Sequence, residues 1–128
     1  MTASADSPLT VPEGGVRPRL YDQPVVYALV ARGYEADTVL ATVHEREGMT
    51  VVVSQEEADD DGLVYEFVGA WITLEARTDL EAIGLTAALS RALADAGIAC
   101  NVVAGFHHDH VVVPWDVRHD ALEVLERL

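Results

Sequence analysis

The apolar residues of this chain are gathered into short runs, each long enough for a single strand or one helix face. Pro24–Ala31 and Met49–Val53 are continuous and rich in β-branched residues, which is typical of buried strands. Trp71–Arg77 alternates polar with apolar residues, which is typical of a strand with one exposed face. Because short strands are stable only within a sheet that packs against other elements, we expect a mixed α/β protein.

Segments with helical spacing lie between these strands. Glu35–Val43 is expected to form a short helix, and Ser54 to cap another through an S-x-x-E capping box. A longer helix is expected to begin at a cap, Thr78 or Asp79, and to end at Gly97. The other expected elements are an edge strand at 16–20, strands at 64–68, 98–104 and 110–113, and a final helix at 121–128.

The order of these elements indicates the fold class. Helices alternate with short strands, and two strands joined by a tight turn follow the long helix, which favours ferredoxin-like βαββαβ units. Two such units fit into 128 residues only if they share strands or a continuous sheet. We therefore expect an α+β protein with a tail at residues 1–15 and two subdomains, residues 16–68 and 69–128, packed together.

Charge argues against two classes of partner. The chain has 22 acidic and 8 basic residues and a formal net charge of −14, and every basic residue is arginine. Such a polyanion repels nucleic-acid phosphates and anionic membrane surfaces, so neither is expected to bind it. The lysine-free, acidic composition also suits a salt-rich cytoplasm, where ions screen the repulsion, and this halophilic interpretation is a hypothesis.

Other features of the sequence favour a cytoplasmic protein. No basic segment followed by an apolar core begins the sequence, and no apolar run reaches membrane-spanning length. Cys100 is the single cysteine, so it has no partner for an internal disulfide. Its apolar neighbours predict a buried thiol in the strand at 98–104.

Three stretches carry a family resemblance: Leu80–Leu89, Leu93–Ile98 and Asp109–Pro114. The glycine in the first stretch, the A-x-A-G-I pattern in the second and the aspartate that opens the third are together similar to an ACT domain. Glu45–Val51 looks like the companion motif in small tandem-ACT proteins. The resemblance covers about Val16 to Leu128. It implies ACT-like units that form a homodimer and bind a free amino acid or similar metabolite at the interface between units, without chemistry or a cofactor of their own.

Candidate ligand-binding residues in the second half are Ile83, Gly84, Leu85, Thr86 and Asp109. The first four are expected in the first turns of the long helix, where unpaired N–H groups and the helix dipole attract a carboxylate. Gly84 lacks a Cβ and permits close approach, and Asp109 can bind an ammonium group. The residues alone leave an alternative open, in which Gly84 eases packing and Asp109 caps a turn.

Candidate residues in the first half are Glu47, Gly48, Met49 and Thr50. Thr50 offers a hydroxyl and Glu47 a second carboxylate to a ligand. The alternative is that Glu47 and Gly48 only form a turn into a strand.

The segment His107–His110 is the one cluster that suggests chemistry. His108 and His110 are expected on one face of a strand and, with a carboxylate, would offer three ligands to a zinc ion that activates water. No HExxH or paired CxxC accompanies them, so no metal is assigned, and a pH-sensitive imidazole is the other interpretation. No nucleophile elbow, phosphate loop or dinucleotide fingerprint is present, so no catalytic residue is assigned.

Three functions follow from these observations. We expect a non-catalytic regulatory protein that binds a free amino acid. The alternatives are an interaction module without a ligand and a small metal-dependent enzyme.

The acidic composition leads to a prediction about salt. If carboxylates repel one another in the folded state, the melting temperature should rise from low to molar KCl, because the Debye length falls from about 30 Å at 0.01 M to about 3 Å at 1 M. Thermal unfolding followed by circular dichroism measures this shift. A melting temperature that does not rise contradicts the halophilic hypothesis.

Overall fold

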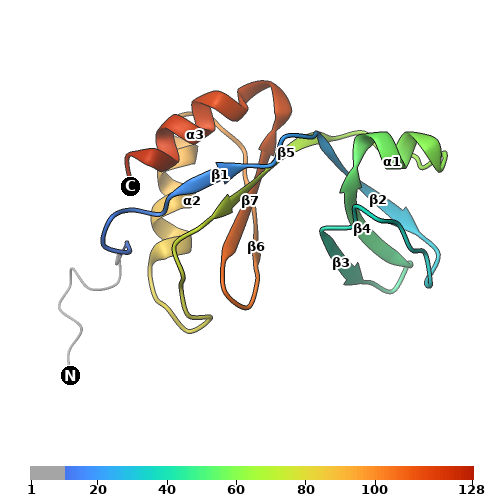
Figure 1. Cartoon of the computed structure of the whole chain (residues 1–128), viewed down its shortest axis with the longest axis horizontal. Helices are drawn as coiled ribbons and strands as arrows, with labels where there is room; N and C mark the ends of the chain where they lie inside the picture. The colour runs from blue at the N-terminus through green and yellow to red at the C-terminus, as the bar shows by residue number, and fades with distance from the viewer. Residues whose placement is uncertain (1–10) are drawn as a thin grey trace. The chain divides into compact units, whose positions relative to one another are not determined.

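The structure is a computed structural model in which residues 11–128 are described, and Figure 1 shows the course of the chain. The chain divides into two units. The first unit is Asp22–Ala70, and the second unit combines the residues up to Tyr21 with Trp71–Leu128. The predicted tail at residues 1–15 falls mostly on residues 1–10, which lie outside the described residues.

The first unit contains strands β2 (Val25–Val30), β3 (Ala41–His44) and β4 (Met49–Ser54) and helix α1 (Gln55–Asp60). The first residues of β5 (Val68–Leu74) complete its sheet, in the order β3-β4-β2-β5 with antiparallel neighbours. Alternate apolar residues of β2 and β4 form a buried core cluster with Ala58 of α1. The strands predicted at 24–31 and 49–53 and the helix predicted after Ser54 are thus confirmed.

The helix predicted at Glu35–Val43 is wrong. Residues 31–40 form turns and irregular segments, and β3 begins at Ala41. Ala36 and Val39, whose spacing suggested a helix, pack against the core cluster without one. The carboxylate of Glu57 accepts hydrogen bonds from the backbone N–H groups of the residues between them, Asp37 at 3.0 Å and Thr38 at 2.7 Å. A distant side chain therefore satisfies backbone donors that a helix would have paired internally.

The N-cap of α1 makes only one of the two hydrogen bonds of the predicted capping box. Ser54 Oγ accepts from the Glu57 N–H at 3.2 Å, as the pattern requires. The reciprocal contact is absent among the described residues, because the Ser54 N–H donates to Thr38 Oγ1 at 3.2 Å instead. The hydrogen bonds that Thr38 and then Asp37 donate to Glu57 lower the pKa of its carboxyl group.

The second unit has the sheet order β6-β7-β5-β1, with β6 at Asn101–Ala104, β7 at Asp109–Pro114 and β1 at Pro18–Leu20. Helix α2 (Leu85–Asp95) connects β5 to β6, and a 3₁₀ turn, Trp115–Val117, leads from β7 into helix α3, Arg118–Glu126. α3 packs against α2 and β1, as Figure 1 also shows. The core of this unit is built from apolar residues of these strands and helices: Ile72, Leu74, Leu89, Leu93, Val111, Val113 and Leu125.

Strand β5 serves both units. Val68 and Gly69 pair with β2, and Ile72–Leu74 pair with β1. β1 comes from the N-terminal side of the chain and takes the place that a strand after α3 would occupy in a βαββαβ unit. The expectation that two ferredoxin-like units would share strands is confirmed.

Several predicted boundaries are wrong. Residues 63–67 have no regular structure, so the strand predicted at 64–68 is absent and β5 begins at Val68. The long helix begins at Leu85 and not at Thr78 or Asp79. β6 begins at Asn101, so Cys100 precedes the strand and is half-buried rather than a buried strand thiol. The edge strand at 16–20, the strand at 110–113 and the final helix are confirmed. No helix within residues 11–128 has the length and apolar character needed to cross a membrane.

Thr38 is expected to stabilise the first unit. Replacing it with valine removes the acceptor of the N–H of Ser54, a residue only 1% exposed, and should lower the free energy of unfolding by about 1–3 kcal/mol. The control is Thr42→Val on β3, where the threonine is exposed and a change below about 0.5 kcal/mol is expected. Urea unfolding of both variants measures the difference, and equal effects would contradict the assignment.

Candidate functional site

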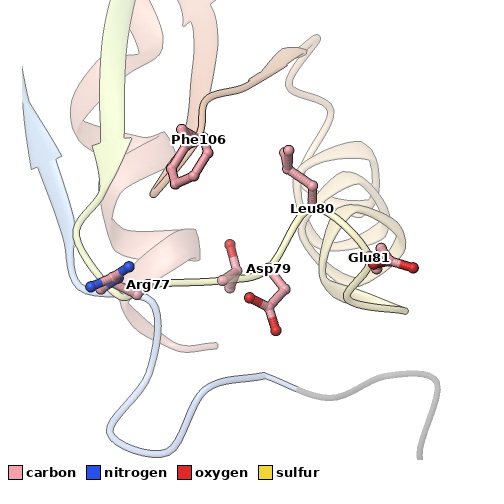
Figure 2. A pocket seen from close by; sticks show the side chains of 6 residues that line it. Arg77, Asp79, Leu80, Glu81 and Phe106 are labelled. Carbon is pink, nitrogen blue, oxygen red and sulfur yellow. The ribbon is translucent and has the colours of Figure 1, made fainter.

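A surface hollow of about 450 Å³ lies in the second unit, beside the segment that joins β5 to α2. Its lining residues are Arg77, Thr78, Asp79, Leu80, Glu81 and Phe106. In Figure 2, four of the labelled side chains come from the loop after β5, and the fifth, Phe106, comes from the turn between β6 and β7. The wall therefore combines one cation, carboxylates and two large apolar side chains.

The loop exists because α2 begins late. Gly84 is the N-cap residue of α2 and has φ of +102°, in the left-handed region that glycine adopts without strain. This conformation interrupts the helix that the apolar spacing of Leu80 and Ile83 predicted, and those side chains remain exposed. A turn closed by the Ala82 N–H and the Asp79 carbonyl, 3.0 Å apart, shapes the loop before Gly84.

Two hydrogen bonds of Thr78 hold the loop on the β6–β7 turn. Its hydroxyl donates to Asp109 Oδ2 at 3.0 Å, and its backbone N–H donates to the carbonyl of His107 at 3.4 Å. Asp109 is half-buried at the start of β7. This predicted ligand-binding residue therefore accepts a hydrogen bond from the loop that lines the hollow.

Arg77 also contacts this turn. One guanidinium nitrogen lies 2.9 Å from His107 Nδ1. Arginine has no acceptor, so the imidazole must accept at Nδ1 and carry its proton on Nε2. The His107 ring in turn meets the Phe106 ring edge to face, with the centroids 4.8 Å apart. His107 thus links the cation of the hollow to its aromatic wall.

The other predicted residues of the second half lie at the start of α2. Gly84 caps the helix, Leu85 is buried in the core, and Ile83 and Thr86 flank them, with Ile83 69% exposed. In the part of the chain that the structure describes, no side chain caps this helix, and its first turn contains no acidic residue. Its N–H groups and dipole therefore present positive potential without a compensating carboxylate from that turn.

Two of the predicted residues of the first half, Glu47 and Gly48, lie in the turn between β3 and β4, and the other two, Met49 and Thr50, begin β4. Glu47 is exposed, while the Met49 side chain is buried in the core cluster. A Cβ at Gly48 would lie 3.0 Å from the carbonyl oxygen of Val30, so the backbone approaches β2 closely at this position. The Thr50 hydroxyl donates to the carboxylate of Glu45. These contacts give Gly48, Met49 and Thr50 structural partners within the unit.

The histidine cluster packs against the sheet. The His110 ring stacks on Trp71 with centroids 5.0 Å apart, and its Nδ1 lies 2.9 Å from Thr73 Oγ1. Burial lowers the pKa of His110, and the nearby His108 acts in the same direction. His108 Nδ1 is buried and has no hydrogen-bond partner among the described residues. Within residues 11–128, no group of three or more His, Cys, Asp or Glu side chains is arranged to hold a metal ion.

Most residues that line the hollow cannot be identified from the local sequence. The sequence pattern predicts Arg77 on the exposed face of a strand, Asp79 as a helix cap and Leu80 within a helix. The residue in the sequence that could have shown the late start of the helix is Gly84. A glycine inside a helix costs about 1 kcal/mol relative to alanine, so Gly84 indicates a helix boundary as readily as a position inside the helix. No local pattern pointed to Phe106, which joins the hollow through long-range contacts.

Comparison with known proteins identifies a family and several similar structures. Two ACT-domain profiles match the chain, one over residues 14–70 and the other over residues 66–127. A solved structure from Vibrio cholerae, of a protein of unknown function described as a possible transport protein, is 37% identical. The match covers 87% of this chain and 88% of that one, with a TM-score of 0.79.

Two further solved structures share the fold at 12% identity. One is a protein from Agrobacterium tumefaciens, with a TM-score of 0.72 and coverage of 88% of each chain. The other is the ligand-free regulatory subunit of aspartate kinase from Thermus thermophilus, with a TM-score of 0.62 and coverage of 89% of this chain and 97% of that one. No curated protein matches the sequence.

The burial of His110 predicts a loss of stability in mild acid. Its folded-state pKa lies below the ordinary value of about 6.5, so the unfolded chain binds this proton more readily. The stabilising contribution is complete above about pH 6.5 and is lost as the pH falls through the folded-state pKa. The unfolding free energy, measured between about pH 8 and pH 5, should fall less in His110→Gln than in the unmodified protein. The control is His119→Gln, at an exposed position, which should keep the pH dependence of the unmodified protein's unfolding free energy. If His110→Gln also keeps that pH dependence, the lowered pKa of His110 is contradicted.

Proposed function

This chain belongs to the ACT-domain family and carries two ACT domains in tandem, and from that premise we propose that it is a regulatory protein that binds a free amino acid. The proposed site is the hollow of the second unit. The observation that carries the proposal is the presence of a guanidinium group and carboxylates in one hollow of about 450 Å³. An amino acid at neutral pH needs partners of both signs, because its carboxylate and ammonium groups are both charged.

Arg77 is the proposed partner of the ligand's carboxylate. A guanidinium group can hold a carboxylate through two parallel hydrogen bonds, and its contact with His107 involves one of its nitrogens. Asp79 is the proposed partner of the ammonium group. Figure 2 shows Arg77 and Asp79 along the same stretch of loop.

The start of α2, which follows the lining residues in the chain, is a second place that favours an anion. Its first turn has neither a side-chain cap nor an acidic residue, so the N–H groups around Gly84 favour an anion. For Asp109, from which the sequence predicts a direct contact with the ammonium group, we propose a positioning role. Its hydrogen bond with Thr78 positions the loop that carries Arg77 and Asp79.

One observation favours the alternative of an interaction module. β3 is at the edge of the first unit's sheet, and the exposed side chains of Val43 on β3 and Leu29 on β2 both lie opposite Thr50 of β4. An edge strand with apolar exposed neighbours is suited to pairing with another chain. A homodimer formed in this way is compatible with ligand binding in the second unit.

Thermal-shift measurements with the twenty amino acids, each with and without EDTA, test the proposed function. An amino acid present at a hundred times its dissociation constant should stabilise the protein by about 2.7 kcal/mol. Arg77→Met should abolish the shift, whereas Arg91→Met, which removes an exposed arginine from α2, should retain it. A uniform absence of stabilisation would favour the interaction module, and destabilisation by EDTA would favour a metal site.

A further inference from the structure

We propose that the hollow selects amino acids with a large apolar side chain, and that Phe106 and Leu80 determine this selectivity. The inference rests on the proposed function, because it concerns the side chain of a ligand whose charged groups are held by Arg77 and Asp79. It assigns a chemical class to the ligand and a role to two residues.

Phe106 and Leu80 are unusually exposed for large apolar residues. Phe106 is 81% and Leu80 66% exposed, and both line the same hollow. A single exposed leucine or phenylalanine is ordinary on a protein surface, but two that converge on one concave site are typical of ligand-binding pockets. Figure 2 shows both side chains on the same side of the loop segment that carries Arg77 and Asp79, with the Asp79 carboxylate directed away from them.

This arrangement matches the shape of an apolar amino acid. Such a ligand has its two charges together at the α-carbon and an apolar group that extends away from them. With the charges at Arg77 and Asp79, the side chain extends toward Phe106 and Leu80. Contact there removes apolar surface of the ligand and of both residues from water, which favours binding in proportion to the area covered.

His107 holds the two ends of the hollow at a set separation. Its Nδ1 is 2.9 Å from the Arg77 guanidinium, and its ring packs edge to face on Phe106 with centroids 4.8 Å apart. The Thr78 N–H donates to the carbonyl of the same residue. The aromatic wall is therefore positioned relative to the cation before a ligand binds, which reduces the entropy lost on binding.

Charged ligand side chains fit this arrangement less well. An acidic side chain would meet Asp79 and Glu81 as well as the net charge of −14 of the whole chain. A basic side chain would need a carboxylate at the far end of the hollow, but Figure 2 shows Glu81 directed away from Phe106 and Leu80. The distribution of groups thus favours an uncharged apolar side chain.

Isothermal titration calorimetry of the full chain with leucine, phenylalanine, serine, glutamate and lysine tests the inference. Leucine or phenylalanine should bind at least about tenfold more tightly than serine, since a few buried methylene groups account for discrimination of that size. Phe106→Ser and Leu80→Ser should each weaken the binding of the apolar ligand by about tenfold and leave serine unaffected. Phe106→Leu should restore most of the affinity.

The matched control is Val64→Ser, which removes an 86% exposed apolar side chain from the first unit and should leave every affinity unchanged. If a polar or charged amino acid binds most tightly, and Arg77→Met but not Phe106→Ser abolishes its binding, the inference is overturned while the proposed function stands. If none of the five amino acids binds to the folded chain, the inference is overturned, and the proposed function is overturned as well if none of the other fifteen binds.

Discussion

The pairing of β5 with two different strands is the constraint on which the architecture depends. Its first residues hydrogen-bond to β2 and its last ones to β1, so one strand of 7 residues pairs with strands of both units. Without this sharing, 128 residues would not supply the strands of two ferredoxin-like units. The same strand leads directly into the loop that lines the hollow, so the fold determines where that loop begins.

The position of the loop then depends on a few polar contacts. Gly84 delays the start of α2, and Thr78 and Arg77 attach the freed segment to the β6–β7 turn through Asp109 and His107. These contacts place a cation, carboxylates and an aromatic ring around one concave surface. An ACT domain of this kind needs no reactive group to act as a regulator, because ligand binding that favours one conformation is sufficient.

The spacing of apolar residues predicts most of the strands correctly. β2, β4, β5 and β7 each bury apolar residues that are continuous or alternate along the local sequence. The spacing failed where a distant partner decides the conformation. The turns at 31–40 replace a helix because Glu57 supplies acceptors to their backbone and the core accepts Ala36 and Val39 without regular structure. The family pattern predicts Asp109 and Gly84 as site residues, whereas Phe106 reaches the hollow only through the tertiary fold, which no local pattern encodes.

A free amino acid that occupies the hollow of the second unit, as we propose, would change the environment of the backbone amides around it. Titration of ¹⁵N-labelled protein with leucine, followed by two-dimensional NMR of the backbone amides, measures this change. We expect saturable shifts concentrated at residues 77–81, at the start of α2 and at 106–109. Shifts confined to residues 47–50, or no shifts for leucine or any other amino acid, would contradict this proposal.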